Sequence, residues 1–184
     1  QPDNAEVQNN LSLILLKRKR FKEGFDKSEW RLKIKDNYLR QLELVREKPE
    51  WTPNDRGKVL LWAEQGIGDE ILFASLIPEL VEKVDQLIIK CDERLIPLFK
   101  RSFNQNIIYI NKKQLINDKK YDYHIAMGSV LKFLRTRKED FKKAKKKYLK
   151  ANKIKTSSYR DKLLKASKSK IIIGISWRSK SKAH

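Results

Sequence analysis

Short apolar runs that alternate with helix-like stretches constrain the fold of this chain most. Most of the runs are continuously apolar, as strands buried on both faces of a sheet should be. They are KVLLWA at 58–63, QLIIKC at 86–91, NIIYI at 106–110, YDYHIAM at 121–127 and KIIIGISW at 170–177. Helix-like stretches at 69–83, 93–101, 138–150 and 157–166 separate them, and Pro78 predicts a kink or a restart in the first. The alternation predicts an α/β fold, a Rossmann-like parallel sheet with flanking helices.

The first 35 residues follow a different pattern, with apolar residues close to helical spacing. These are Leu11, Ile14, Leu15, Phe21, Phe25, Trp30 and Leu32. We predict a helical hairpin over 1–35 that turns near 18–21. Such a hairpin either packs on the rest of the chain or continues an array of earlier repeats, and the abrupt start of the chain favours an array. In an array, Leu11, Leu13 or Leu15 should be exposed.

Prolines, Asn54 and Gly57 predict a linker at 36–57 between the hairpin and the sheet domain at 58–184. The last apolar run leads directly into RSKSKAH, where the chain ends. We interpret the chain as a fragment that stops where a second lobe should begin.

The charge of the chain is strongly basic, with 43 Lys and Arg against 23 Asp and Glu and a formal net charge of +20. Such an excess is typical of proteins that bind nucleic acid, acidic membranes or phosphorylated substrates. The densest basic run, at 142–155, has no series of aromatic residues for stacking bases. We interpret it as a solvated helix face, and we expect no specific nucleic-acid partner.

Cysteine and hydropathy patterns exclude further classes of function. The single cysteine, Cys91, ends an apolar run and is predicted to be a buried structural thiol. No Cys/His cluster has metal-ligand spacing, so we expect neither a metal nor another cofactor. No apolar run reaches the ~18 residues of a membrane span, and the polar N-terminus does not have the pattern of a signal peptide. These features favour a cytoplasmic protein without a transmembrane segment.

The stretch WAEQGIGDEILF, at 62–73, joins the first predicted strand to the first predicted helix through two glycines. It lacks the Gly-Lys-Ser/Thr ending of a P-loop, and Ile71 replaces the third glycine or alanine of a dinucleotide fingerprint. Glu64, Asp69 and Glu70 would repel a phosphate, so the turn should not hold a pyrophosphate. Two hypotheses for Asp69 remain open: a helix cap, or a general base at the carboxyl edge of the sheet.

Several segments are similar to the N-terminal lobe of GT-B glycosyltransferases of the ADP-heptose heptosyltransferase-like superfamily. The similarity is most specific at EQGIGDE (64–70) and GISWRS (174–179), and it extends through ERLIPLFKRSF (93–103) and YDYHIAMGSV (121–130). The segment at 10–32 resembles the last tetratricopeptide repeat of a repeat-bearing branch, and KPEWTPNDRGK (48–58) resembles its connecting segment. In heptosyltransferases proper the proline after Gly-Asp comes sooner than Pro78 does here, so the identity of the acceptor is not carried over.

The resemblance implies a two-lobed enzyme that moves a sugar from a nucleotide-sugar donor to a glycan or protein acceptor. It implies that Asp69 is the general base and that the N-terminal lobe holds the acceptor. Candidate acceptor-binding residues are Glu64, Gln65, Gly66, Gly68, His124 and Ser129, with a structural role as the alternative for His124. Candidate donor-phosphate contacts are Ser176, Arg178, Lys180 and Lys182, with a solvated basic tail as the alternative. We interpret Trp62 and Trp177 as packing residues.

Two other functions are kept as alternatives. One is a non-catalytic module in which helical repeats that bind a protein partner precede a degenerate sugar-binding lobe. The other is a basic nucleic-acid binder, whose affinity should fall steeply with salt. Under the leading hypothesis the chain alone should be inactive, because the donor has no site without a second lobe.

Overall fold

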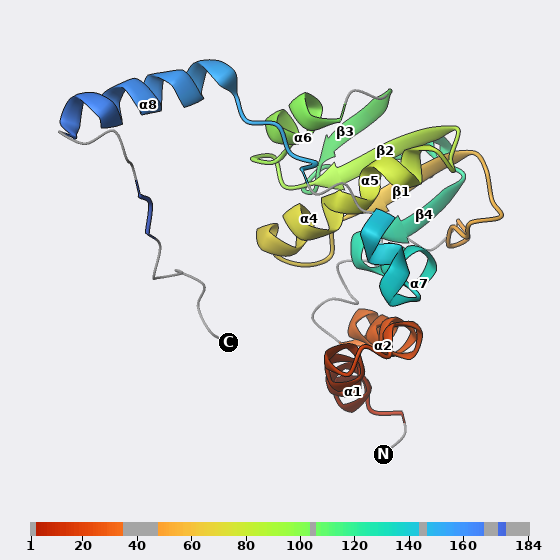
Figure 1. Ribbon diagram of the computed structural model, residues 1–184. Coiled ribbons are helices and arrows are strands. Elements are labelled where there is room, and N and C mark those ends of the chain that lie inside the picture. The colour runs from red at the N-terminus through yellow and green to blue at the C-terminus, as the bar shows by residue number, and fades with distance from the viewer. Residues whose placement is uncertain (1–2, 35–47, 104–105, 144–146, 168–172, 176–184) are drawn as a thin grey trace. The chain divides into compact units, whose positions relative to one another are not determined.

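The computed structural model describes residues 3–34, 48–103, 106–143, 147–167 and 173–175. The chain divides into two compact units, residues 1–150 and 151–184. The first unit contains a helical hairpin and a sheet with its helices, and the described residues of the second include one helix (Figure 1). Among the described residues, no helix has the length and apolar character needed to cross a membrane.

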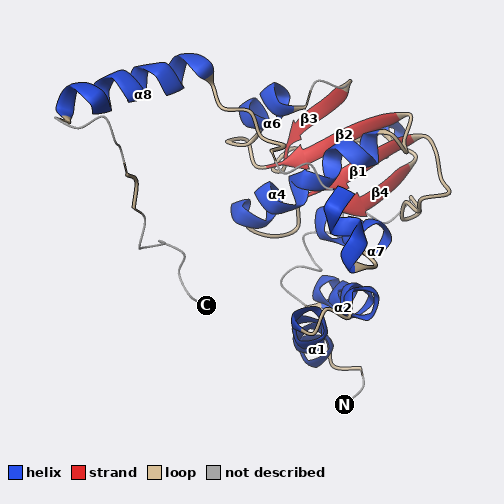
Figure 2. Cartoon of the chain, in the orientation of Figure 1, coloured by secondary structure: helices blue, strands red, loops and turns tan. Residues whose placement is uncertain are grey.

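Four strands form one parallel sheet in the order β3-β2-β1-β4 (Figure 2). The strands are β1 (Lys58–Trp62), β2 (Gln86–Cys91), β3 (Ile107–Asn111) and β4 (Tyr123–Ala126). In the register, Val59 of β1 lies opposite Leu87 on one side and Tyr123 on the other. The predicted α/β fold with a parallel sheet is thus confirmed. The predicted strand at 170–177 lies outside the described residues except for 173–175, which have no regular structure.

The helical segment that follows β1 is interrupted and restarts near Pro78, as the sequence predicts. α4 (Ile67–Phe73) leads through the 3₁₀ helix η2 (Ala74–Leu76) into α5 (Ile77–Val81). Pro78 stands in the first turn of α5, where its missing N–H costs no helical hydrogen bond. The next connection carries α6 (Ile96–Ser102), and a short 3₁₀ helix, η3 (Asp118–Lys120), precedes β4.

After β4 the structure differs from the sequence-based expectation. The chain forms η4 (Met127–Val130) and α7 (Leu131–Leu134), which were not predicted, and then η5 (Lys138–Lys143). The predicted helix at 138–150 is wrong at 147–150, which have no helical structure. There the backbone pairs with side chains instead: the Lys150 N–H donates to Ser102 Oγ at 2.9 Å and the Lys150 carbonyl accepts from Arg101 at 2.7 Å.

Each face of the sheet carries its own apolar cluster. On one face, Val59, Leu61, Ile89 and Ile125 pack with residues of the flanking helices, including Ile77, Leu80 and Phe99. On the other face, Leu60, Trp62, Ile88 and Ala126 pack with Tyr121, Leu32 and Ile116. Trp62 is buried, as its interpretation as a packing residue predicts.

The hairpin consists of α1 (Ala5–Lys17), α2 (Phe21–Ser28) and the 3₁₀ helix η1 (Glu29–Lys33). The turn between α1 and α2 includes Lys19 with a φ of 62°, close to the predicted position. Gly24 lets the two helices approach, since a Cβ there would lie 2.7 Å from Leu16 Cγ. Leu11 and Leu13 are exposed, at 38% and 60%, whereas Leu15 is buried. The hairpin therefore presents apolar side chains to solvent.

The second unit contains α8 (Lys153–Ala166), which begins four residues before the predicted start at 157. Asn152 caps it by accepting a hydrogen bond from the Lys155 N–H at 3.0 Å. None of its residues is buried.

Candidate functional site at the carboxyl edge of the sheet

Asp69 lies just beyond the carboxyl end of β1, in the first turn of α4. Gly66 is the N-cap of this helix, and Asp69 is the third helical residue rather than the cap. Asp69 Oδ2 accepts a hydrogen bond from the Gly66 N–H at 3.2 Å, which is half of a capping box. Asp69 Oδ1 has no hydrogen-bond partner among the residues that the structure describes, and the residue is partly exposed. One carboxylate oxygen thus stabilises the helix start, and the other is available to a ligand.

The two glycines of the turn leave open space beside Asp69. A Cβ on Gly68 would meet no atom within 4 Å, and a Cβ on Gly66 would meet only Asp69 Oδ2, at 3.5 Å. Gly66 has an extended backbone, with a φ of −73°, so its conformation does not require glycine. The two glycines therefore leave room for another molecule to approach, and the backbone conformation of Gly66 does not explain why glycine is there.

Glu64 and Ser129, from the ends of β1 and β4, are brought together by Arg31 of the hairpin. Arg31 Nη2 donates to Glu64 Oε1 and to Ser129 Oγ, both at 2.9 Å. The Gly128 N–H also donates to Glu64 Oε1, at 3.1 Å. The side chains of Arg31 and Glu64 are only 7% and 1% exposed. A ligand would reach Glu64 or Ser129 only if the hairpin moved, so their acceptor-binding role stays a prediction.

Further charged residues of the hairpin and the sheet domain extend this network. Ser129 Oγ donates to Glu29 Oε1 at 2.8 Å, and Lys132 Nζ donates to Glu29 Oε2 and to Glu50 Oε1, both at 2.9 Å. Burial acts to raise the pKa of Glu29, but the charges of Arg31 and Lys132 hold it below its ordinary value. We call Glu29, Arg31, Glu64, Ser129 and Lys132 the clasp, because they join the hairpin to the sheet edge.

His124 lies on the opposite face of the sheet from α4, among the buried residues around Trp62. Its Nδ1 accepts a hydrogen bond from Trp62 Nε1 at 3.3 Å. Burial lowers the pKa of His124, although the nearby carboxylate of Glu50 acts in the other direction. The structure gives His124 a packing role and does not bring it together with Asp69, so acceptor binding by His124 also stays a prediction.

Glu70 is buried and connects α4 to the ends of β2 and β3. Its Oε2 accepts from the Asp92 N–H at 2.8 Å, and its Oε1 accepts from Lys112 Nζ at 3.0 Å. Cys91 lies beside this group and is buried, as predicted. Burial, together with the charges of Glu70 and Asp92, raises the pKa of the Cys91 thiol to about 12. A thiol with this pKa stays protonated at neutral pH and is a poor nucleophile.

The remaining sequence candidates are distributed unevenly. Gln65 lines a pocket beside the hairpin. Ser176, Arg178, Lys180 and Lys182, with Trp177, lie outside the described residues. Within the part of the chain that the structure describes, no group of three or more His, Cys, Asp or Glu side chains could hold a metal ion.

Sequence reasoning missed the clasp residues of the hairpin, Glu29 and Arg31. Helical spacing marks Trp30 and Leu32 as apolar positions, and the charged residues beside them, Glu29 and Arg31, carry no motif. A buried arginine is recognised only from its partners, which here lie 33 and 98 residues away in the chain.

Comparison with known proteins gives one match. No family model matches the chain, and no solved structure matches it. Protein FlbA of Caulobacter vibrioides is 32% identical over 160 residues, which cover 77% of this chain and 26% of FlbA. The chain therefore spans about a quarter of the length of this relative.

Proposed function

We propose that the chain is the acceptor-side lobe of a GT-B glycosyltransferase of the ADP-heptose heptosyltransferase-like superfamily. The hairpin is then the last tetratricopeptide repeat before the lobe. The position of Asp69 carries the proposal: a carboxylate with one free oxygen, at the carboxyl end of the first strand of a parallel sheet. Ligands of open α/β folds bind outside the carboxyl ends of the strands. The open space at Gly66 and Gly68 supports it further.

In the proposed reaction, Asp69 takes the proton of an acceptor hydroxyl. The hydroxyl oxygen forms a bond to the anomeric carbon of the donor sugar, and the nucleoside diphosphate leaves with the electrons of the broken bond. Ser176, Arg178, Lys180 and Lys182 would contact the donor phosphates, because arginine and lysine bind phosphate through charge and N–H donors. The cytoplasm, where nucleotide sugars are made, is the proposed location.

A non-catalytic interaction module is the second candidate. Two observations favour it: Asp69 Oδ2 is engaged by the Gly66 N–H, and the clasp covers Glu64 and Ser129. Under this hypothesis the acidic turn is a structural junction between the hairpin and the sheet.

The substitution Asp69→Asn in the full-length protein separates the two candidates. Asparagine keeps the size of the side chain and accepts the hydrogen bond from Gly66, but it is no base. Sugar transfer should fall by about 10²- to 10⁴-fold, with a nearly unchanged melting temperature. The measurement is release of nucleoside diphosphate from a panel of nucleotide sugars, with melting followed by circular dichroism.

Asp85→Asn is the matched control, because Asp85 is an exposed aspartate before β2 whose carboxylate pairs with the exposed Arg56, at 3.8 Å, on the surface. It should leave transfer unchanged. Near-normal transfer in Asp69→Asn would contradict the general-base hypothesis and leave Asp69 with a structural role. The 184-residue chain by itself should turn over no donor, since one of the two substrates has no complete site.

A further inference from the structure

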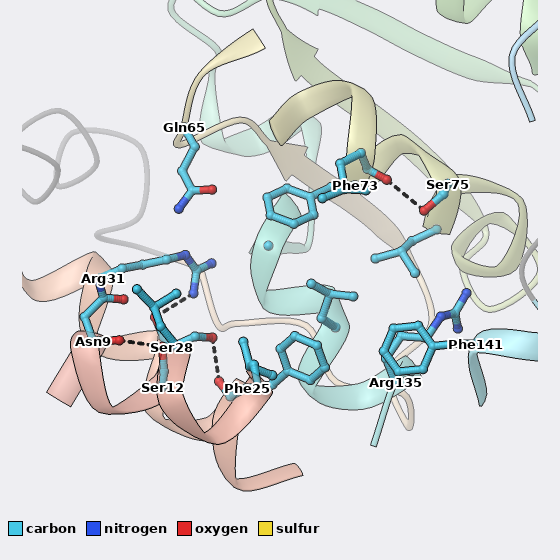
Figure 3. A pocket seen from close by; sticks show the side chains of 16 residues that line it. Asn9, Ser12, Phe25, Ser28, Arg31, Gln65, Phe73, Ser75, Arg135 and Phe141 are labelled. Carbon is cyan, nitrogen blue, oxygen red and sulfur yellow. Dashed lines mark hydrogen bonds between the residues drawn. The ribbon is translucent and has the colours of Figure 1, made fainter. Parts of the chain in front are cut away.

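A pocket of about 400 Å³ opens between the hairpin and the sheet domain. Leu13, Leu16 and Phe25 line it from the hairpin, and Leu72, Phe73 and Leu131 line it from the sheet domain. Figure 3 shows Phe25 and Phe73 on these two sides. Arg31 and Arg135 also line it, but each is already paired with carboxylates, Arg31 with Glu29 and Glu64 and Arg135 with Glu79. The pocket therefore offers an apolar surface whose charges are neutralised from within the protein.

The apolar surface continues from the pocket to the outside of the molecule. Leu13 and Leu72, on opposite walls, are 60% and 61% exposed. A ligand that contacts both leucines would extend beyond the pocket. An extended molecule such as a peptide can do this, whereas a small enclosed molecule cannot. The volume suffices for one or two large apolar side chains.

Two amide side chains mark one end of the pocket. Figure 3 shows Gln65 on the sheet-domain side and Asn9 on the hairpin side at the same end. Within the described part of the chain, neither amide group makes a hydrogen bond. A carboxamide offers both a donor and an acceptor, which is the pair that an extended peptide backbone presents.

Exposed cations lie beside the hairpin side of the pocket, together with one exposed carboxylate, Asp26, next to Phe25. Lys17 follows Leu13 by one helical turn on α1, and the exposed Arg18 and Lys19 come next. On the other side, the exposed Lys142 follows Phe141, which lines the pocket. These cations favour a partner whose residues beside the apolar anchor are acidic.

We propose that this pocket binds an extended segment of another protein, with leucine-like side chains in the pocket and acidic residues beside them. The backbone of the segment pairs with Gln65 and Asn9, and its carboxylates lie near Lys17, Arg18 and Lys19. This binding is independent of sugar transfer, so it can succeed or fail whether or not Asp69 is a catalytic base.

Fluorescence anisotropy of the 184-residue chain with three labelled ten-residue peptides tests the proposal. The first peptide contains two leucines flanked by aspartate and serine, the second has serine in place of leucine, and the third has lysine in place of aspartate. The first should bind about tenfold or more tightly than either of the others, because it alone supplies both features.

Leu72→Asp should weaken binding of the first peptide by about tenfold or more, since it places a charge on the exposed pocket wall. Leu115→Asp is the matched control, because Leu115 is 86% exposed and lies outside the pocket. Gln65→Ala should weaken binding several-fold through loss of a backbone hydrogen bond. Circular dichroism verifies that all three variants are folded.

Several outcomes would overturn the proposal. One is that none of the peptides binds, and another is that Leu72→Asp and Leu115→Asp behave alike. A concentration-dependent dimer that Leu72→Asp abolishes, seen by sedimentation velocity without peptide binding, would assign the surface to a second copy of the chain. Binding of dodecanoate without peptide binding would make the pocket a small-molecule site.

Discussion

Three carboxylates that stand within seven residues of one another reach three different environments at the start of α4. Glu64 is bound by Arg31 through Oε1, while its buried Oε2 has no partner among the described residues, and Glu70 is bound by Lys112 and the Asp92 N–H. Asp69 differs because its oxygen without a described partner belongs to a partly exposed residue. The acidic turn in a basic chain is therefore mostly structural. The sequence shows that three acidic residues are close together there. Which of them are paired depends on Arg31 and Lys112, which come from distant elements.

At the residue scale, His124 should make stability depend on pH. Its pKa is lowered in the folded protein, so below about pH 6.5 the unfolded chain binds a proton that the folded chain resists. The free energy of unfolding should therefore be fully retained above pH 6.5, and it should decrease as the pH falls towards the folded pKa. Urea unfolding at pH 7.5 and 5.5 measures the effect.

His124→Asn isolates this contribution, because asparagine can still accept the hydrogen bond from Trp62 but does not titrate. The free energy of unfolding should differ less between pH 7.5 and pH 5.5 in this variant than in the parent chain. An equal difference in the parent and the variant would assign the pH dependence to other groups and would contradict the role of His124.

At the element scale, continuously apolar runs predicted the strands well. β2 begins and ends where predicted, and β1 and β3 are within one residue. In β1 and β2, side chains buried on both faces leave little freedom in register. The segment after β4 was predicted poorly. Its lysines favour a helix locally, but Tyr148 and Leu149 pack against the core and Tyr148 Oη donates to the Ile71 carbonyl at 2.9 Å. Tertiary contacts override helix propensity at this position.

The clasp is an element-scale junction, and Arg31→Met tests it. The substitution leaves Glu64 buried without its cation, which should cost about 3–5 kcal/mol in the free energy of unfolding. In a double-mutant cycle with Glu64→Gln, the double variant should lose clearly less than the sum of the two single variants. Urea unfolding measures all four proteins.

Arg94→Met is the control for the clasp experiment. Arg94 also pairs with a carboxylate, Asp92, but its side chain is 69% exposed, so solvent screens the pair and its loss should change the free energy of unfolding little. If Arg31→Met costs no more than Arg94→Met, the hairpin is not held by the clasp.

At the scale of the whole molecule, the two compact units differ in what they bury. The first unit holds both apolar clusters, whereas the described residues of α8 include exposed apolar side chains such as Ile154 and Tyr159 and none that is buried. A helix with no buried face gains little stability from packing. The folding free energy of the chain should therefore come almost entirely from residues 1–150.

Removal of residues 151–184 tests this distribution and the predicted strand at 170–177 together. If the four-stranded sheet is complete, the shortened chain should unfold cooperatively in urea, with a midpoint and a dependence on denaturant close to those of the 184-residue chain. If residues 170–177 instead form a further strand of the sheet, their removal would expose an apolar edge. The urea midpoint of the shortened chain would then be lower than that of the 184-residue chain. A second shortened chain that ends at residue 167 keeps α8 and shows where any loss of stability arises. If both shortened chains have an equally low urea midpoint, the missing stability belongs to residues 168–184.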